Sequence, residues 1–167
     1  HAAAAVLTYL SPGLRFFHQG QFEGRLKRVS PHLGRSPDEP VNATVQKFYE
    51  RLLEILRRPV VRNGHWQLLE CVPACDGNGS SDDFIACMWQ EPGGERLLVA
   101  VNYSAHQSQC YVRLPLADLD RGSWRLEDLL SDARYDRNGR ELQSHGLYLD
   151  VPPWHSHVFQ MNAMTWK

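Results

Sequence analysis

The sequence of 167 residues predicts a mainly β protein, with an antiparallel β-sandwich over residues 63–167 that follows an α/β segment over residues 1–62. The central observation is the stretch from Phe84 to Tyr103, where two apolar runs of strand length flank a Pro-Gly-Gly turn, as in antiparallel hairpins. Both faces of both runs are apolar. We therefore expect this hairpin to lie centrally in a sheet that is covered by strands on one face and by a helical layer on the other.

The β region is predicted from the change in spacing after Gly64. Helical periodicity ends there, and short runs with period-two alternation follow, separated by turn-rich segments such as Asp76–Gly79 and Arg137–Gly139. The expected strands are Trp66–Val72, Phe84–Gln90, Arg96–Tyr103, Gln109–Leu114, Ser123–Asp128, Gly146–Val151 and His155–Met161. About 100 residues in short strands predict a sandwich with a core of its own.

The first residues show helical and buried-strand patterns instead. Ala2–Leu10 is rich in alanine and leucine, and Ser11-Pro12-Gly13 ends the run, so a helix is expected. It has almost no polar face, which indicates that the neighbours needed to bury it are missing. The short apolar run Leu14–Phe17 predicts a buried parallel strand that opens into a polar loop at His18.

A second helix is expected between Asn42 and Arg58. Asn42 is a suitable N-cap, and Pro59 prevents the helix from continuing. Its apolar stripe consists of Val45, Phe48, Tyr49, Leu52, Ile55 and Leu56. The preceding segment Arg25–Pro40 is basic, rich in proline and aperiodic, so it predicts a loop. The order helix, strand, long loop and helix is typical of the end of an α/β barrel.

Charge and composition indicate which partners to expect. Hydrophobic residues make up 43% of the chain and the formal net charge is −1, as in ordinary globular proteins. There is no basic excess that would favour nucleic acid. The apolar stretch Ala2–Leu10 is too short to span a bilayer, so no membrane association is expected. The compartment is left open, with the cytoplasm as the working expectation.

The four cysteines predict neither a metal site nor a cofactor. Cys71 and Cys75 have three residues between them and no matching second pair, and a disulfide between them remains open. Cys87 and Cys110 fall on inward strand positions, where a thiol usually packs as a small apolar group.

Tryptophans and histidines in the β region have two interpretations each. The tryptophans in question are Trp66, Trp89, Trp124 and Trp154. They fit either sugar stacking or a place in the core or at a domain interface, and the second is expected for aromatic residues at strand spacing. His155 and His157 share one strand face and could ligate a metal together, but without a third ligand nearby they are expected to be an exposed pair.

Two segments carry a resemblance to a known family. They are LSPGLRFFHQGQFEG, residues 10–24, and GLYLDVPPWHSHVFQM, residues 146–161, which closes the β region. With the intervening helix that ends in arginines, they resemble the end of an α-amylase-like enzyme of glycoside hydrolase family 13. The positions that fit the family's last-strand motif are Pro12, Gly13, Phe16, Phe17, Gln19, Gly20, Gln21 and Gly24. His18 stands where tyrosine is usual and Phe22 where glutamate is usual, with Glu23 one position later.

The resemblance implies a fold and a function for the whole chain. Residues 1–62 would be an α/β remnant of a (β/α)8 catalytic barrel, its last strand and helix, and residues 63–167 a Greek-key-like C-domain. The parent enzyme would hydrolyse or transfer α-glucosidic bonds in α-glucans. Cleavage of such bonds needs two carboxylates across the bond, and in the family these lie on earlier barrel strands. No catalytic residue is therefore expected in this chain, which should be inactive alone. The departures at His18 and Phe22 favour a divergent subgroup or a related transglycosylase.

Four residues after the expected strand are candidates for substrate binding. His18, Gln19, Gln21 and Arg25 could hydrogen-bond sugar hydroxyls or support a neighbouring carboxylate. The alternative is that they cap the loop and pack against the barrel, because short polar loops commonly satisfy their own backbone groups.

The expected partners follow from the same resemblance. They are the missing N-terminal barrel of the parent chain and, through it, an α-glucan. Self-association through Ala2–Leu10 is also expected, because that helix would expose apolar surface. Two other functions remain open: a non-catalytic carbohydrate-binding β-sandwich module, and a self-contained interaction domain whose first sixty residues fold independently of any larger barrel.

Overall fold

The computed structural model describes residues 1–27, 32, 34–35 and 37–164, and in this part of the chain nine strands form two antiparallel sheets. The larger sheet has the strand order β1 (His65–Leu69), β3 (Phe84–Gln90), β4 (Arg96–Asn102), β9 (Ser156–Met164), β6 (Ser123–Asp128) and β7 (Arg134–Asn138). The smaller sheet has the order β2 (Cys71–Pro73), β5 (Ser108–Val112) and β8 (Leu147–Val151). The mainly β class predicted from the sequence is confirmed.

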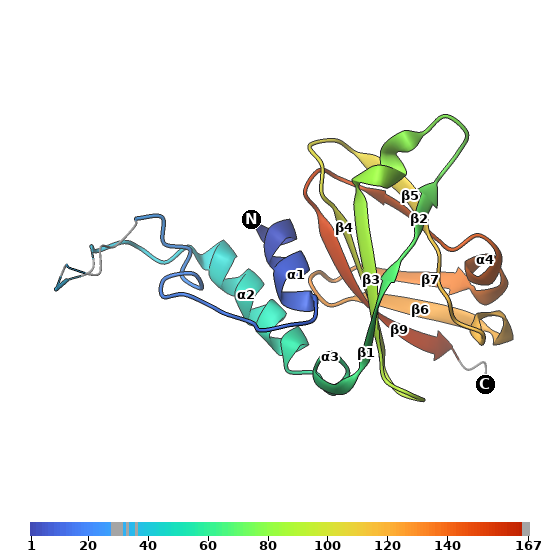
Figure 1. Ribbon diagram of the computed structural model, residues 1–167, viewed down its shortest axis with the longest axis horizontal. Coiled ribbons are helices and arrows are strands. Elements are labelled where there is room, and N and C mark those ends of the chain that lie inside the picture. The colour runs from blue at the N-terminus through green and yellow to red at the C-terminus, as the bar shows by residue number, and fades with distance from the viewer. Residues whose placement is uncertain (28–31, 33, 36, 165–167) are drawn as a thin grey trace.

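The hairpin β3–β4 occupies the position that its two apolar faces predict. Both strands are interior to the larger sheet, and Gln90 pairs with Arg96 next to the turn. Ala86 and Met88 of β3 pack into the core shared with the smaller sheet, whereas Cys87 and Trp89 pack into a second core formed with the helices. Strands therefore cover one face and helices the other, as Figure 1 shows.

The helical layer consists of α1 (Ala2–Leu10), α2 (Ala43–Leu56) and α3 (Pro59–Asn63). The predicted bounds of the first helix are confirmed. Asn42 caps α2 by accepting hydrogen bonds from the N–H groups of Thr44 and Val45, at 3.1 and 3.2 Å. Pro59 ends that helix as predicted but also begins α3, where its fixed φ suits the first helical position. None of the helices in the described part of the chain is long and apolar enough to cross a membrane.

The expectation that α1 lacks neighbours is wrong for its inward side. Val6 and Leu10 are fully buried, and the helix contacts β4, β9 and α2. The sheet itself supplies the missing cover, because its outer face is as apolar as its inner one. Only the outward positions of α1, such as Ala4 and Thr8, are exposed.

The expected strand Leu14–Phe17 is also wrong for this structure. Residues 14–18 form neither helix nor strand, and Leu14 and Phe16 are 97% and 74% exposed. A strand needs a neighbour for its backbone groups, and none of the described strands lies beside this segment. In the predicted loop 25–40, the described residues form no helix or strand, and positions 28–31, 33 and 36 lie outside the described residues.

The β region departs from the prediction at three places. The expected strand Trp66–Val72 is divided, because β1 pairs with β3 in one sheet and β2 pairs with β5 in the other. Strand β7 and the short helix α4 (Gly139–Ser144) were not predicted, and β9 extends to Met164. Two short 3-10 helices complete the described elements, η1 (Gly79–Asp83) and η2 (Leu119–Arg121).

Candidate functional site

The loop that carries the four predicted substrate-binding residues is a set of tight turns after α1. His18 N–H donates to the Gln21 side chain at 3.3 Å, and Arg25 N–H donates to the carbonyl oxygen of Gly20 at 2.9 Å. Gly20 has φ +85°, and the aliphatic part of Arg25 lies 3.1–3.4 Å from the position that a Cβ at Gly20 would take. The structure therefore brings His18, Gln19, Gln21 and Arg25 into one compact loop.

Within this loop, the Gln21 side chain makes hydrogen bonds that hold the fold together. Its amide nitrogen donates to the hydroxyl groups of Tyr9 and Tyr49, at 2.6 and 2.8 Å. The Tyr9 hydroxyl donates to the carbonyl oxygen of Phe16 at 3.1 Å, so Gln21 links α1, α2 and the loop. Burial raises the pKa of Tyr49. His18, Gln19 and Arg25 are exposed, and their side chains remain open for contact with a ligand.

Phe22 belongs to a cluster of aromatic rings under the loop. Its ring lies 5.1 Å from Phe17 and 5.4 Å from Tyr49, and Phe17 stacks on Tyr9 at 4.2 Å. Phe22 therefore forms a packing contact between the loop and the helices.

The helical layer is fixed to the sheet by polar contacts as well as by its apolar core. The indole N–H of Trp89 donates to the carbonyl oxygen of Leu10 at 2.7 Å in a buried position. At the other end of the layer, the Arg58 guanidinium donates to Glu95 in the β3–β4 turn and to Gln160 of β9, the latter at 3.3 Å. Trp89 is thus an interface residue, in agreement with the structural interpretation of the tryptophans.

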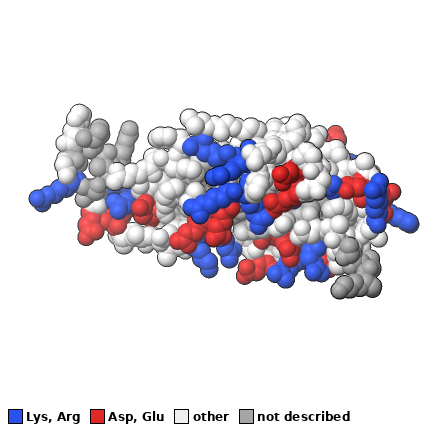
Figure 2. All heavy atoms as spheres, turned by 90° about the horizontal axis from the view of Figure 1, so that it is seen from below, with Lys and Arg blue, Asp and Glu red and all other residues white. Residues whose placement is uncertain are grey.

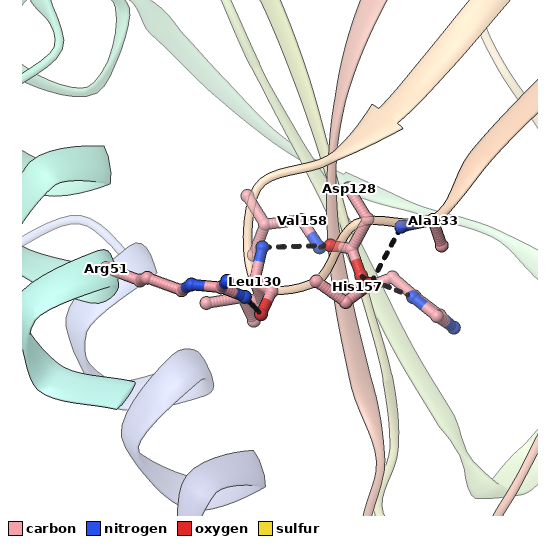
Figure 3. A network of polar contacts seen from close by, with 7 residues as sticks. Arg51, Asp128, Leu130, Ala133, His157 and Val158 are labelled. Carbon is pink, nitrogen blue, oxygen red and sulfur yellow. Dashed lines mark hydrogen bonds and ion pairs between the residues drawn. The ribbon is translucent and has the colours of Figure 1, made fainter. Parts of the chain in front are cut away.

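A third attachment uses the loop Leu129–Ala133 between β6 and β7 (Figure 3). Figure 3 shows that Arg51 of α2 donates to the carbonyl oxygen of Leu130. The Arg51 guanidinium also lies 3.6 Å from the carboxylate of Asp132. Asp132 is fully exposed, so this ion pair contributes little to the stability of the fold. The hydrogen bond to the backbone is the more specific contact, because it ties α2 to a loop of the larger sheet.

The shape of this loop depends on Asp128, the last residue of β6. Its buried carboxylate accepts from Val158 N–H and Leu130 N–H at 3.0 and 3.2 Å, from Ser131 Oγ at 2.6 Å, and from His157 Nδ1 at 3.0 Å. Burial alone would raise the pKa of Asp128, but the hydrogen bonds from His157, Ser131 and Val158 outweigh it and lower that pKa. The carboxylate therefore stays charged and holds the loop in place. Figure 3 shows its contacts with Val158 and His157.

His157 of β9 and His155, which precedes that strand, are not the exposed pair that the sequence predicts, because only His155 is exposed. His157 is mostly buried, bonded to Asp128 and stacked on Phe159 at 4.9 Å. Its ring centre lies 5.0 Å from that of His155. Partial desolvation, and then the neighbouring His157, lower the pKa of His155. Among the residues that the structure describes, no group of three or more His, Cys, Asp or Glu side chains could hold a metal ion.

Sequence reasoning missed Asp128 and Arg51. Asp128 follows Trp124 and Leu126 at inward positions of β6, and a carboxylate in such a series is a signal of a satisfied buried charge. Arg51 gives no comparable signal, because arginine is ordinary on the outer face of a helix.

Neither the surface charge nor the comparisons with known proteins indicate a particular function. On the face shown in Figure 2, acidic and basic side chains are intermixed. No protein-family model and no curated protein matches this chain.

Proposed function

We propose that this chain is the C-terminal region of an α-amylase-family enzyme that hydrolyses or transfers α-glucosidic bonds in α-glucans. Residues 1–62 are then the last strand and helix of the (β/α)8 catalytic barrel, and residues 63–167 are its β-sandwich C-domain. The catalytic carboxylates belong to the parent's earlier strands. The role of the C-domain is to cover one side of the barrel and to stabilise it.

The observation that carries this proposal is the exposure of large apolar side chains in the segment after α1. Leu14, Phe16 and Leu26 are 97%, 74% and 91% exposed, although α1 and α2 on either side are well packed. Three large apolar side chains exposed on one segment indicate that a packing partner is missing. A barrel strand without its neighbouring strands would expose such side chains and pair with no other strand, as Leu14–Phe17 does here.

The stabilising role is supported by the way the helical layer is attached. Three separate elements of the β region bind the helices: Trp89 holds the end of α1, Glu95 holds Arg58, and the Leu129–Ala133 loop holds Arg51. A barrel whose last helix is fixed in this way gains a rigid support on that side. His18, Gln19 and Arg25 would then lie on the loop at the C-terminal end of the last strand, where α/β barrels bind their ligands.

The proposal can be tested with the coding sequence upstream of the codon for His1. We expect an α/β barrel with two or three acidic residues at strand ends. Co-expression of that segment with this chain should restore hydrolysis or transfer on maltooligosaccharides, and neither part should be active alone. The upstream residue at the end of a strand that serves as nucleophile, changed from Asp to Asn, gives the inactive control. An upstream sequence without such a barrel would refute the proposal.

A self-contained interaction domain is the second candidate, and the burial of α1 favours it. Val6, Tyr9 and Leu10 are covered by the sheet and by α2 without any further domain. On this alternative, the chain needs no barrel and the co-expression experiment gives no activity. A carbohydrate-binding module would likewise leave the pair inactive but would bind glucan. Self-association stays a prediction, and the exposed Leu14 and Phe16 are better placed for it than α1.

A further inference from the structure

Two exposed aromatic side chains form a corner on the surface of the β region. Tyr103 follows β4 and Trp154 lies between β8 and β9, and their ring centres are 5.3 Å apart with the ring planes at 83°. Tyr103 is 45% exposed and Trp154 50% exposed. The two rings therefore meet at nearly a right angle, and each is half open to solvent.

The backbone at Trp154 is held in an unfavourable conformation. Among the described residues, Trp154 is the only one other than glycine with a positive φ, +56°. For a bulky side chain this region is a genuine outlier, whereas glycine adopts it without strain. Strained residues persist where their surroundings fix them, and they cluster at binding sites. The strain and the exposure of Trp154 together indicate that its ring is presented for contact.

The side chain of Asn102 fixes the two loops that carry these rings. This fully buried side chain donates to the carbonyl oxygens of His106 and Val151, at 2.7 and 2.9 Å, and accepts from Ser104 N–H at 3.1 Å. The Trp154 N–H then donates to the carbonyl oxygen of Ser104 at 3.1 Å. The corner is therefore built before any ligand arrives, which lowers the entropic cost of binding.

The groups on the same loops indicate what kind of ring fits. His106 and Gln107 are exposed, and they offer an imidazole and an amide to hydroxyl groups. The Gln107 amide donates to the carboxylate of Asp150 at 2.5 Å, so an acidic group lies beside this loop. A phosphate-bearing ligand would be repelled by that charge. A neutral sugar ring is suited, because its C–H face can stack on the negative face of an indole while its hydroxyls reach polar neighbours.

We propose that Tyr103 and Trp154 form a surface binding site for one glucosyl ring of an α-glucan, with Trp154 as the stacking platform and Tyr103 as the side wall. The choice of a sugar ring rests on the geometry of the corner and on the polar groups beside it. Its assignment to α-glucan rests on the proposed function.

The experiment is affinity electrophoresis of the full chain in gels that contain amylopectin, with thermal unfolding of each variant. The wild type should be retarded, and Trp154→Gly and Tyr103→Ala should each lose about tenfold or more in affinity. Tyr148→Ala, which removes another exposed aromatic ring, is the matched control and should bind as the wild type does. Because glycine relieves the strain at φ +56°, the unfolding temperature of Trp154→Gly should equal or exceed that of the wild type.

Each of the other results overturns the inference. They are a wild type that is not retarded, a Trp154→Gly variant that binds unchanged, and a Trp154→Gly variant whose unfolding temperature falls, which would make Trp154 a packing residue. Retardation by a β-glucan gel alone would overturn the assignment to α-glucan. Restored activity on co-expression without retardation would refute only this site, whereas retardation with no barrel encoded upstream would refute only the proposed function.

Discussion

Trp89 and Leu10 join the sheet to the first helix through a hydrogen bond of 2.7 Å between the indole N–H and the last carbonyl group of α1. Both residues are buried, and 79 positions separate them in the chain. The contact matters because the last four carbonyl groups of a helix have no partner within it, and a buried one must be satisfied from elsewhere. A strand of the β region thus completes a helix of the N-terminal segment.

Replacement of Trp89 by phenylalanine should therefore destabilise the chain. The change removes the donor and leaves a buried carbonyl group without it, which costs about 1–3 kcal/mol in the free energy of unfolding. Urea-induced unfolding followed by circular dichroism measures this loss. Trp154→Phe, at a half-exposed ring, is the control and should change the free energy by about 0.5 kcal/mol or less. Equal losses in both variants would contradict a specific role for the Trp89 hydrogen bond.

The carboxylate of Asp128 makes a prediction that depends on pH. Asparagine cannot accept the bonds from Ser131 and His157 with its amide nitrogen, so Asp128→Asn should cost about 1.5–3 kcal/mol at neutral pH. Because the folded protein lowers the pKa of Asp128, its stabilising effect is complete above the unfolded value of about 3.9. The effect is lost as the pH falls from there through the folded pKa.

The difference between wild type and Asp128→Asn should accordingly be largest near pH 7 and shrink below about pH 4. Chemical unfolding at a series of pH values measures it, with Asp132→Asn as the control in the same loop. Asp132 is fully exposed, and its replacement should have almost no effect. A constant difference across the pH range would show that shape, and not charge, accounts for the effect of Asp128.

Much of the fold could be predicted because its signals are local. The hairpin β3–β4 has its turn and both apolar faces within Phe84–Tyr103, and α2 has its cap and stripe within fifteen positions of Asn42. Strand β7 was missed because Arg134–Asn138 is polar on both faces and is defined only by its pairing with β6. The change of sheet near Glu70 gives no local signal either, since the apolar pattern continues across it.

The site was less predictable, because its contacts join distant positions. Asp128 and His157 are 29 residues apart, and only the register of β6 against β9 brings them together. Gln21 could be identified as a residue of interest, but its partners Tyr9 and Tyr49 lie on two different helices. Sequence patterns show which residue types are present, whereas the packing of the layers decides which of them meet.

The residues of the loop after α1 should separate into two groups by their effect on stability. Gln21→Ala removes hydrogen bonds to Tyr9 and Tyr49 and should cost about 1–2 kcal/mol. His18→Ala and Gln19→Ala, at exposed positions, should change stability by about 0.5 kcal/mol or less. In the co-expressed pair, the same two variants should instead weaken the affinity for maltooligosaccharides. If they change neither property, these side chains only cap the loop.

The four cysteines should differ widely in reactivity, because the thiolate is the reactive form. Cys75 is exposed, and a hydrogen bond with the Cys110 thiol lowers the pKa of Cys71. That hydrogen bond and burial raise the pKa of Cys110, and burial raises the pKa of Cys87 to about 11. At pH 8 the thiolate fraction of Cys87 is then about one thousandth, and its burial slows the reaction further.

A thiol-specific chromogenic disulfide reagent at pH 8 should therefore modify Cys75 first and Cys71 next, and should leave Cys87 and Cys110 intact until the chain is unfolded. The structure has Cys71 and Cys75 as free thiols, so prior reduction should not change the number of rapid groups. In denaturant all four should react at similar rates, which controls for the reagent. Rapid modification of Cys87 in the native chain would show that β3 opens to solvent and that the helical layer does not hold its side of the sheet closed.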